Sequence, residues 1–182
     1  MTLMAPQLTQ GSSTGSIATK DRAGSTEQEQ MLQLLTFTLD DHDYGIELFK
    51  IQEIRGYAPI TPIPNLPPHV RGVMNLRGIV LPVIDLRTKF HLPAIEYTKF
   101  TVIVIALVED KVVGLLVDAI SDVLQVALSS IRPAPDFGTT VDTQFIHGVF
   151  HARDHLVVAL NLERLLTEGE LTVTESLQEN PA

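Results

Sequence analysis

The chain repeats part of its own sequence, and this repeat limits the folds that it can adopt. Residues 44–54 match residues 113–123 without a gap, at an offset of 69 (113 minus 44). Residues 72–86 match residues 148–162 at an offset of 76 (148 minus 72). The second half therefore carries an insertion, which falls near residues 133–138, a segment with the proline and glycine typical of loops. β-rich segments can also resemble one another by chance, and the sequence alone leaves that alternative open.

Both halves show the same order of apolar and polar segments. In each half, two short apolar runs flank a polar turn, a third run follows, and a loop leads to a hairpin. Apolar runs of this length between polar turns indicate β-strands. In the first hairpin, Arg77-Gly78 predicts a tight turn, because glycine accepts a positive φ. The predicted strands and hairpins cover residues 35–39, 44–48, 52–54 and 73–86 in the first half and residues 102–107, 112–117, 121–124 and 149–160 in the second.

The hairpin strands are apolar on both faces, as residues 79–84 and 156–160 show. A strand with one wet face alternates instead, so these strands must be covered on both sides. We expect each half to form a five-stranded antiparallel barrel, since closure removes exposed edges. The two barrels then pack together, with a groove along their junction. Pro82 cannot donate to a ladder and is expected at an edge or a bulge. A short helix over residues 161–166, with Asn161 as its N-cap, is expected to end the second half.

The two ends of the chain differ from its body. Residues 1–31 are rich in Ser, Thr, Gly and Gln and contain no aromatic side chain, which predicts a disordered tail. Residues 172–182 are acidic and sparse in apolar side chains, which predicts a frayed end. The body spans residues 32–171, with a first barrel over about 32–95 and a second over about 96–168.

The composition excludes several classes of function. The formal net charge of −9 argues against nucleic acid as a partner, because a phosphate-binding surface needs clustered cations. The chain has no cysteine, so disulfide frameworks and thiol catalysis are excluded. Its start lacks the basic and apolar segments of a secretion signal, and its apolar runs are too short to insert into a membrane. We therefore expect a cytoplasmic protein.

A metal site and a catalytic site are both poorly supported. His147, His151 and His155 are spaced by four residues, which on a helix would place them on one face. The repeat instead places them on a hairpin, where residues four apart are separated by about 13 Å, too far to share one ion. The sequence has no phosphate-binding glycine loop and no nucleophile elbow. We expect no metal, no cofactor and no catalytic residue.

One pair of opposite charges is present in both halves. Glu53 and Arg77 lie at positions that correspond, through the repeat, to Asp122 and Arg153. Retention of an acid and a guanidinium at both places predicts that the two groups meet in space as a charge-assisted hydrogen bond. The alternative is that all four are solvated surface charges, which contribute little to stability.

Several motifs of the chain resemble those of the CheW family, the bacterial chemotaxis coupling proteins. The similarity runs from about residue 34 to residue 166 with hardly a gap, and only the longer N-terminal tail departs from the usual pattern. The motifs that carry it are YGI at 44–46, QEIRGY at 52–57, GVMNLRG at 72–78, PVIDLR at 82–87, VD at 117–118, SDVL at 121–124 and IRPAP at 131–135.

The resemblance implies two SH3-like barrels and an adaptor that joins the cytoplasmic tips of chemoreceptors to the histidine kinase CheA. The regulatory domain of that kinase is itself similar to CheW, so the two can alternate in rings within membrane-associated receptor arrays. The runner-up function is a small-ligand sensor that uses the groove between the barrels. For Val102 and Val123 a place in the core is the alternative to a role in binding. By position, the receptor and kinase interface involves Ile51, Glu53, Arg77, Val102 and Val123.

Overall fold

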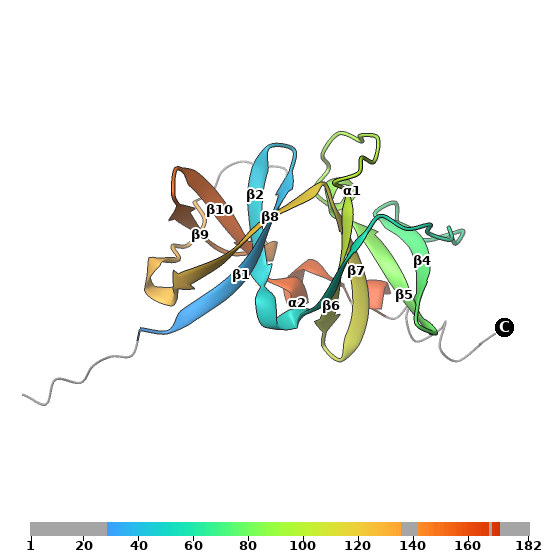
Figure 1. The fold of residues 1–182 in the computed structure, drawn as a ribbon, viewed down its shortest axis with the longest axis horizontal. Helices are drawn as coiled ribbons and strands as arrows, with labels where there is room; N and C mark the ends of the chain where they lie inside the picture. The colour runs from blue at the N-terminus through green and yellow to red at the C-terminus, as the bar shows by residue number, and fades with distance from the viewer. Residues whose placement is uncertain (1–28, 136–141, 168, 172–182) are drawn as a thin grey trace, which may run out of the picture.

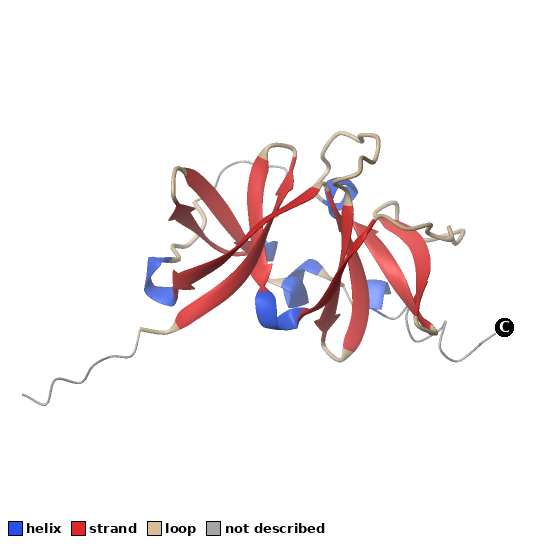
Figure 2. Ribbon diagram, viewed as in Figure 1, coloured by secondary structure: helices blue, strands red, loops and turns tan. Residues whose placement is uncertain are grey.

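The structure is a computed structural model, and it describes residues 29–135, 142–167 and 169–171. Strands dominate these residues, and the helices are all short (Figures 1 and 2). The predicted all-β class is therefore confirmed. The strands are β1 (Met31–Leu39), β2 (His42–Glu47), β3 (Ile51–Gly56), β4 (Val70–Leu76), β5 (Ile79–Asp85), β6 (Val102–Val108), β7 (Lys111–Val117), β8 (Ala119–Ala127), β9 (Ile146–Ala152) and β10 (His155–Leu160). The helices are η1 (Leu48–Lys50), α1 (Leu86–Lys89), η2 (Leu128–Ser130), η3 (Thr143–Phe145) and α2 (Leu162–Leu165).

The strands form two five-stranded sheets that lie side by side (Figure 1). Sheet A has the order β8-β1-β2-β10-β9, and sheet B has the order β3-β6-β7-β5-β4. The two orders correspond strand by strand: β1 and β2 of sheet A have the places of β6 and β7 in sheet B, and β8, β9 and β10 have the places of β3, β4 and β5. The internal repeat is therefore a structural repeat that relates the two sheets.

The division of the chain into two contiguous barrels, over residues 32–95 and 96–168, does not describe these sheets. Sheet A combines the first two strands of the first half with the last three of the second, and sheet B combines the remaining strands. Each sheet also contains one parallel pair, whereas antiparallel pairing alone was expected. The halves exchange strands because β2 pairs with β10 and β7 pairs with β5, each across the boundary between the halves.

The two parallel pairs have the same register. Gly45 of β2 lies opposite Ala159 of β10, and Gly114 of β7 lies opposite Val83 of β5. These are equivalent positions, since Gly114 follows Gly45 by 69 and Ala159 follows Val83 by 76. A Cβ atom at Gly114 would lie 2.9 Å from a methyl carbon of Ile103, so this position requires glycine.

Three apolar clusters fill the molecule. The largest lies between the sheets and takes side chains from both, including Phe37 and Tyr44 of sheet A and Val104 and Leu115 of sheet B. A second cluster, with Leu81 and other residues, belongs to sheet B alone, and a third belongs to sheet A. A strand that contributes side chains to two clusters is buried on both faces. This explains why the sequences of such strands are apolar throughout. The expectation of two packed units that cover one another is confirmed.

A single bridge joins the two edges of each sheet. Thr61, which follows edge strand β3, exchanges two backbone hydrogen bonds of 2.8 and 2.9 Å with Val73 of the opposite edge strand β4. Arg132, which follows β8, does the same with Val149 of β9 at 2.9 and 2.8 Å. These bridges draw the ends of each sheet together, as expected for barrel-like sheets.

Pro82 occupies a different place from the one expected. It lies in β5, between β7 and β4, and not in an edge strand. Its partner Val73 directs its N–H and C=O toward Thr61, so the nitrogen of Pro82 faces away from β4. The parallel ladder with β7 begins only at Val83. In sheet A the equivalent residue, Val158, belongs to the parallel ladder, so the ladder of sheet B is shorter at the end that holds its proline.

Both halves end in one turn of helix with a side-chain cap. The predicted C-terminal helix is present as α2, where Asn161 accepts a hydrogen bond of 3.0 Å from the N–H of Arg164. The equivalent Asp85 accepts from the N–H groups of Arg87 and Thr88 at the start of α1. This second cap was not predicted, although the repeat aligns Asp85 with Asn161.

The first strand begins one residue before the predicted body. Met31, assigned to the N-terminal tail, is the first residue of β1 and pairs with Ala127 of β8. The carbonyl of Gln30 accepts a hydrogen bond of 2.8 Å from Leu128. Most of the expected tails, residues 1–28 and 172–182, lie outside the described residues.

At the other end, Glu170 and Leu171 are buried. The Glu170 carboxylate pairs with His69 and with Lys89, whose Nζ lies 2.5 Å from Oε1, and accepts from the N–H of Thr167 at 2.6 Å. Burial by itself would raise the pKa of Glu170, but the bonds from Lys89 and Thr167 and the nearby positive charges outweigh it and lower the pKa.

Gly72→Ala should lower the free energy of unfolding by at least about 2 kcal/mol. Gly72 has a φ of +139°, and an added Cβ would lie 2.1 Å from the carbonyl oxygen of Thr61, inside the bridge that joins the sheet edges. Gly56→Ala is the matched control, since nothing lies within 4 Å of a Cβ there. Urea denaturation of both variants measures the difference, and equal stability of the two would contradict this role of Gly72.

Glu170→Gln should reduce the acid sensitivity of folding. Because the pKa of Glu170 is lowered in the folded state, its ionised form stabilises the fold above the unfolded pKa of about 4.3, and this contribution is lost as the pH falls through the folded pKa. The variant should be less stable than wild type near pH 6, by ~1–3 kcal/mol, because it lacks the ionised carboxylate. Between pH 6 and pH 3 its free energy of unfolding should fall less than that of wild type. Glu96→Gln, at an exposed position, should follow the wild-type curve. An unchanged pH dependence in Glu170→Gln would overturn the assignment.

Candidate partner-binding site

Glu53 and Arg77 form the predicted ion pair. Nη1 of Arg77 lies 2.9 Å from Oε2 of Glu53, and Nε of Arg55 lies 3.8 Å from the other carboxylate oxygen. Arg77 and Gly78 make a tight turn with φ values of +52° and +87°. The side chain of Asn75 accepts a hydrogen bond of 2.9 Å from Gly78 and holds this turn. The turn therefore presents the guanidinium directly to the carboxylate on β3.

The second predicted pair is also present, at the equivalent place on the other sheet. Nη2 of Arg153 lies 3.5 Å from Oδ2 of Asp122. In both sheets the acid lies on one edge strand and the arginine lies in the hairpin turn that begins at the opposite edge strand. Each ion pair thus spans the two edges of its own sheet.

The two pairs differ in their exposure. The carboxylate side chain is 26% exposed at Glu53 and 51% exposed at Asp122. The Glu53 pair is also shorter and has a second cation in Arg55. An ion pair that is partly shielded from water is stronger and better ordered than a fully solvated one. The Glu53–Arg77 pair is therefore the better fixed of the two.

The other predicted interface residues divide between the two sheets. Ile51 of β3 and Val102 of β6 belong to sheet B, and both are partly buried against the core between the sheets. Val123 lies on β8 of sheet A and is 46% exposed, so the alternative of a core position is wrong for Val123. For Val102 the packing supports a core role. Four of the five predicted residues, all except Val123, thus belong to sheet B or to its hairpin turn.

Two exposed apolar residues near this site were missed from the sequence. Ile54, beside Glu53 on β3, is 43% exposed and is the equivalent of Val123 in the repeat. Phe49, in η1 just before β3, is 77% exposed. The repeat could have identified Ile54, because it aligns with Val123. No pattern in the sequence distinguishes Phe49 from a core phenylalanine.

Arg87 forms a buried charged centre that is structural. Its Nη2 lies 3.0 Å from Asp40, its Nη1 contacts Asp118, and its Nε donates to the carbonyl of Pro93 at 2.9 Å. The side chain is only 7% exposed. Asp40 lies in the β1–β2 turn of sheet A and α1 follows β5 of sheet B, so Arg87 holds the two sheets together. The guanidinium is thus fully engaged within the fold, with two carboxylates and one carbonyl as partners.

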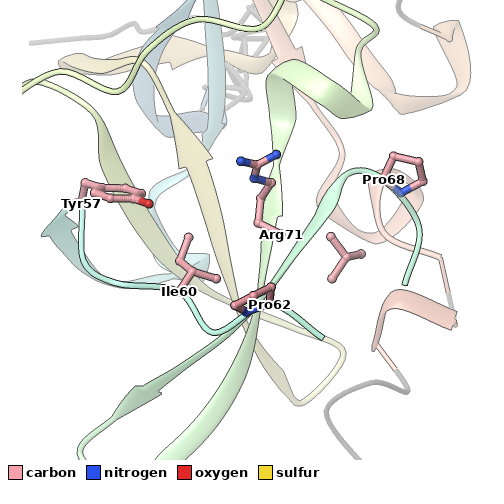
Figure 3. A pocket seen from close by; sticks show the side chains of 6 residues that line it. Tyr57, Ile60, Pro62, Pro68 and Arg71 are labelled. Carbon is pink, nitrogen blue, oxygen red and sulfur yellow. The ribbon is translucent and has the colours of Figure 1, made fainter. Parts of the chain in front are cut away.

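Two of the cavities lie on the side of sheet B. One, of about 390 Å³, is lined by residues of the 57–71 segment (Figure 3). The next, of about 480 Å³, adds residues of the 85–97 segment. The space between the sheets is instead filled by the large apolar cluster that includes Phe37 and Tyr44. The sensor alternative, which needs an open groove there, is not favoured.

The described residues provide no group of three His, Cys, Asp or Glu side chains suited to a metal ion. His147, His151 and His155, the candidates considered from the sequence, are exposed on β9 and β10. His155 is paired with Ala152, the residue after His151, so the side chains of His151 and His155 lie on opposite faces of the sheet. Within the same described ranges, no helix is long and apolar enough to cross a membrane.

These features define a class of protein that acts by contact, with two related sheets, charged pairs at their edges and exposed apolar side chains beside them. Comparison with known proteins identifies the family. The family model for the CheW-like domain matches residues 33–170, and the chain belongs to the CheW family.

Several curated relatives and one solved structure support this membership. The chemotaxis protein CheW of Klebsiella aerogenes is 39% identical over 145 residues, which cover 80% of this chain and 87% of that protein. The probable chemotaxis protein CheW of Rhizobium etli is 38% identical and covers 76% of this chain and 89% of that protein. The crystal structure of the scaffolding protein TtCheW from Thermoanaerobacter tengcongensis has 30% identity and a TM-score of 0.72, covering 81% of this chain and 96% of that chain. The chain is thus a chemotaxis coupling adaptor of the scaffold type and not an enzyme.

Arg77→Ala and Arg87→Ala should differ sharply in stability. Arg77 is 76% exposed, so its loss should cost less than about 1 kcal/mol. Loss of Arg87 leaves the Asp40 and Asp118 carboxylates without their shared partner and should cost about 3 kcal/mol or more. Thermal and urea denaturation of the two variants measure this contrast. Comparable losses in both would show that the exposed pair holds the fold.

Proposed function

We propose that this chain couples the cytoplasmic tips of chemoreceptors to the histidine kinase CheA, and that the Glu53–Arg77 pair lies in the receptor-binding surface. Membership in the CheW family supports the general role. The observation that carries the site assignment is the ordered ion pair of 2.9 Å at the edge of sheet B. The chain reaches membrane-associated receptor arrays through this contact.

The ion pair fixes the shape of the surface. Glu53 is held on β3 opposite Ile105, and Arg77 is held in a turn with both central residues at positive φ. When a partner covers such a pair, water is removed and the electrostatic interaction becomes stronger. The pair contributes little to the stability of the free protein and more to the bound state.

Exposed apolar side chains adjoin the pair in the sequence. Ile54 follows Glu53, and Ile79 begins β5 two residues after Arg77 and is 47% exposed. Phe49 lies two residues before Ile51. Apolar anchors around a few ordered charges are the usual composition of a specific, reversible interface. Ile51 and Val102 support this surface from beneath, since both pack against the core.

An adaptor needs a second surface, and the structural repeat supplies one. Sheet A carries Val123, which is 46% exposed, beside the Asp122–Arg153 pair. We assign this surface to the second partner, the regulatory domain of CheA. Val123 then serves the kinase side of the interface, while the other four predicted residues serve the receptor side.

Glu53→Ala and Arg77→Ala should each weaken receptor binding by about tenfold to a hundredfold while the protein stays folded. Removal of one partner leaves the other charge unpaired beneath the receptor. In a double-mutant cycle the losses should be less than additive, because both variants break one interaction. Binding to a soluble receptor-tip fragment and activation of CheA measure the effect.

Asp122→Ala and Arg153→Ala are the matched controls, since they remove the equivalent pair from sheet A. These controls should leave receptor-tip binding within about twofold of wild type and should weaken the kinase contact instead. Full additivity of the Glu53 and Arg77 losses would refute the pairing. Wild-type receptor binding in both variants would remove the pair from the site.

A further inference from the structure

We propose that a groove beside β4 binds a short extended peptide segment of a partner protein, in which a carboxylate pairs with Arg71 and neighbouring proline or aliphatic residues pack on Ile60, Pro62 and Pro68. This is a site separate from the Glu53–Arg77 surface and shares no residue with it. The residues that line the cavity, called the Arg71 groove, are Tyr57, Ile60, Pro62, Pro68, Val70 and Arg71 (Figure 3).

The groove has the size and rigidity of a binding site. Its volume is about 390 Å³, within the range of ordinary ligand cavities. Pro62 and Pro68 have fixed φ angles, and the Thr61–Val73 bridge holds the residue before Pro62 against β4. A further hydrogen bond of 2.9 Å, from Val70 to the carbonyl of Pro67, ties the last proline turn to the strand. A site with stiff walls loses little entropy when it binds.

Arg71 interacts with the side chain of Tyr97 but has no carboxylate partner in the described part of the chain. It is the extra residue of a bulge between Val70 and Gly72, and bulges redirect side chains away from a sheet. Arg71 is exposed, and among the described residues no carboxylate lies within ion-pair distance of it. It is also the sole charged residue that lines this cavity. A guanidinium without a carboxylate partner favours an anionic group.

Tyr57 gives the groove an aromatic wall and packs on Tyr97, which lines the adjoining cavity. The rings of Tyr57 and Tyr97 have centroids 4.6 Å apart, and the guanidinium carbon of Arg71 lies 5.9 Å from the Tyr97 ring. The backbone N–H of Tyr57 donates to Thr101 at 3.1 Å, which fixes its position. Burial raises the pKa of Tyr97, so its hydroxyl stays protonated and able to donate. Aromatic walls of this kind suit proline rings in an extended segment.

The concavity continues on both sides of Arg71. The adjoining cavity, of about 480 Å³, also includes Arg71 and extends along Ile95 and Tyr97. Its other charged lining residues are Asp85, Arg87 and Glu96, so the position for a carboxylate is at Arg71, on the side of the first cavity. Ile95 is 46% exposed and adds apolar surface. A site that runs past its central charge in two directions matches a peptide better than a compact metabolite.

The repeat shows that the bulge itself does not require these residue types. The equivalent of Tyr57 is Val126 and the equivalent of Arg71 is His147, so sheet A keeps the same bulge without an aromatic residue or a guanidinium. The groove is therefore a feature of sheet B and not of both sheets.

Selection from a random-peptide display library on the immobilised full-length chain tests the proposal. Enriched peptides should contain Asp or Glu within a few residues of proline or an aliphatic side chain. Synthetic copies, measured by fluorescence anisotropy, should bind Arg71→Glu at least about tenfold more weakly than wild type. A peptide in which lysine replaces the Asp or Glu should bind Arg71→Glu at least about tenfold more tightly than the original peptide does. Tyr57→Ala should weaken the same peptides.

Arg164→Glu is the matched control, because Arg164 is also exposed but lies on α2, away from the groove. The affinity of Arg164→Glu for the enriched peptides should stay within about twofold of wild type. Melting temperatures should confirm that all variants are folded. Failure to enrich any peptide would overturn the proposal, as would equal binding to Arg71→Glu. Displacement of the peptide by free succinate at comparable affinity would identify a small-carboxylate site in place of a peptide site.

Discussion

The fold depends on two short parallel strand pairs, β2 with β10 and β5 with β7. Each has three residue pairs, and both have the same register. They join strands from different halves of the chain, so neither half can complete a sheet by itself. The apolar cluster between the sheets, with Phe37, Tyr44, Val104 and Leu115, forms only when both sheets are complete. The two sheets are therefore expected to be one cooperative unit, and the buried Arg87 with Asp40 and Asp118 adds a charged link between them.

The candidate receptor surface inherits this arrangement. Glu53 comes from the first half, but its strand β3 pairs with β6 of the second half, where Val104 and Ile105 fill the cores beneath. Arg77 reaches Glu53 because the Thr61–Val73 bridge draws β4 toward the segment after β3. The exposed ion pair is thus fixed by buried packing, which is how a surface pair with little effect on stability can have a defined geometry. The same reasoning applies to the Arg71 groove, whose walls depend on the same bridge.

Much of this could be predicted from the sequence, because the repeat preserves particular residues for physical reasons. The two acid–arginine pairs followed directly from aligned positions, and the Asn161 cap followed from the preference of asparagine for helix starts. The exchange of strands did not, since the repeat relates the same residues whether a sheet forms within one half or between two. Runs that are apolar on both faces show that a strand is covered but not which strands cover it. Pro82 could not be placed because a proline fits in β5 only where the ladder with β7 has not yet begun. The position of Val123 could not be predicted because it depends on which sheet contains β8.

Native-state hydrogen exchange tests most directly the claim that the two sheets form one unit. Backbone amides of β2 and β10 in sheet A and of β5 and β7 in sheet B should exchange with a common free energy of opening, equal to that of global unfolding. Two groups of amides, one for each sheet, with clearly different free energies of opening would contradict the account.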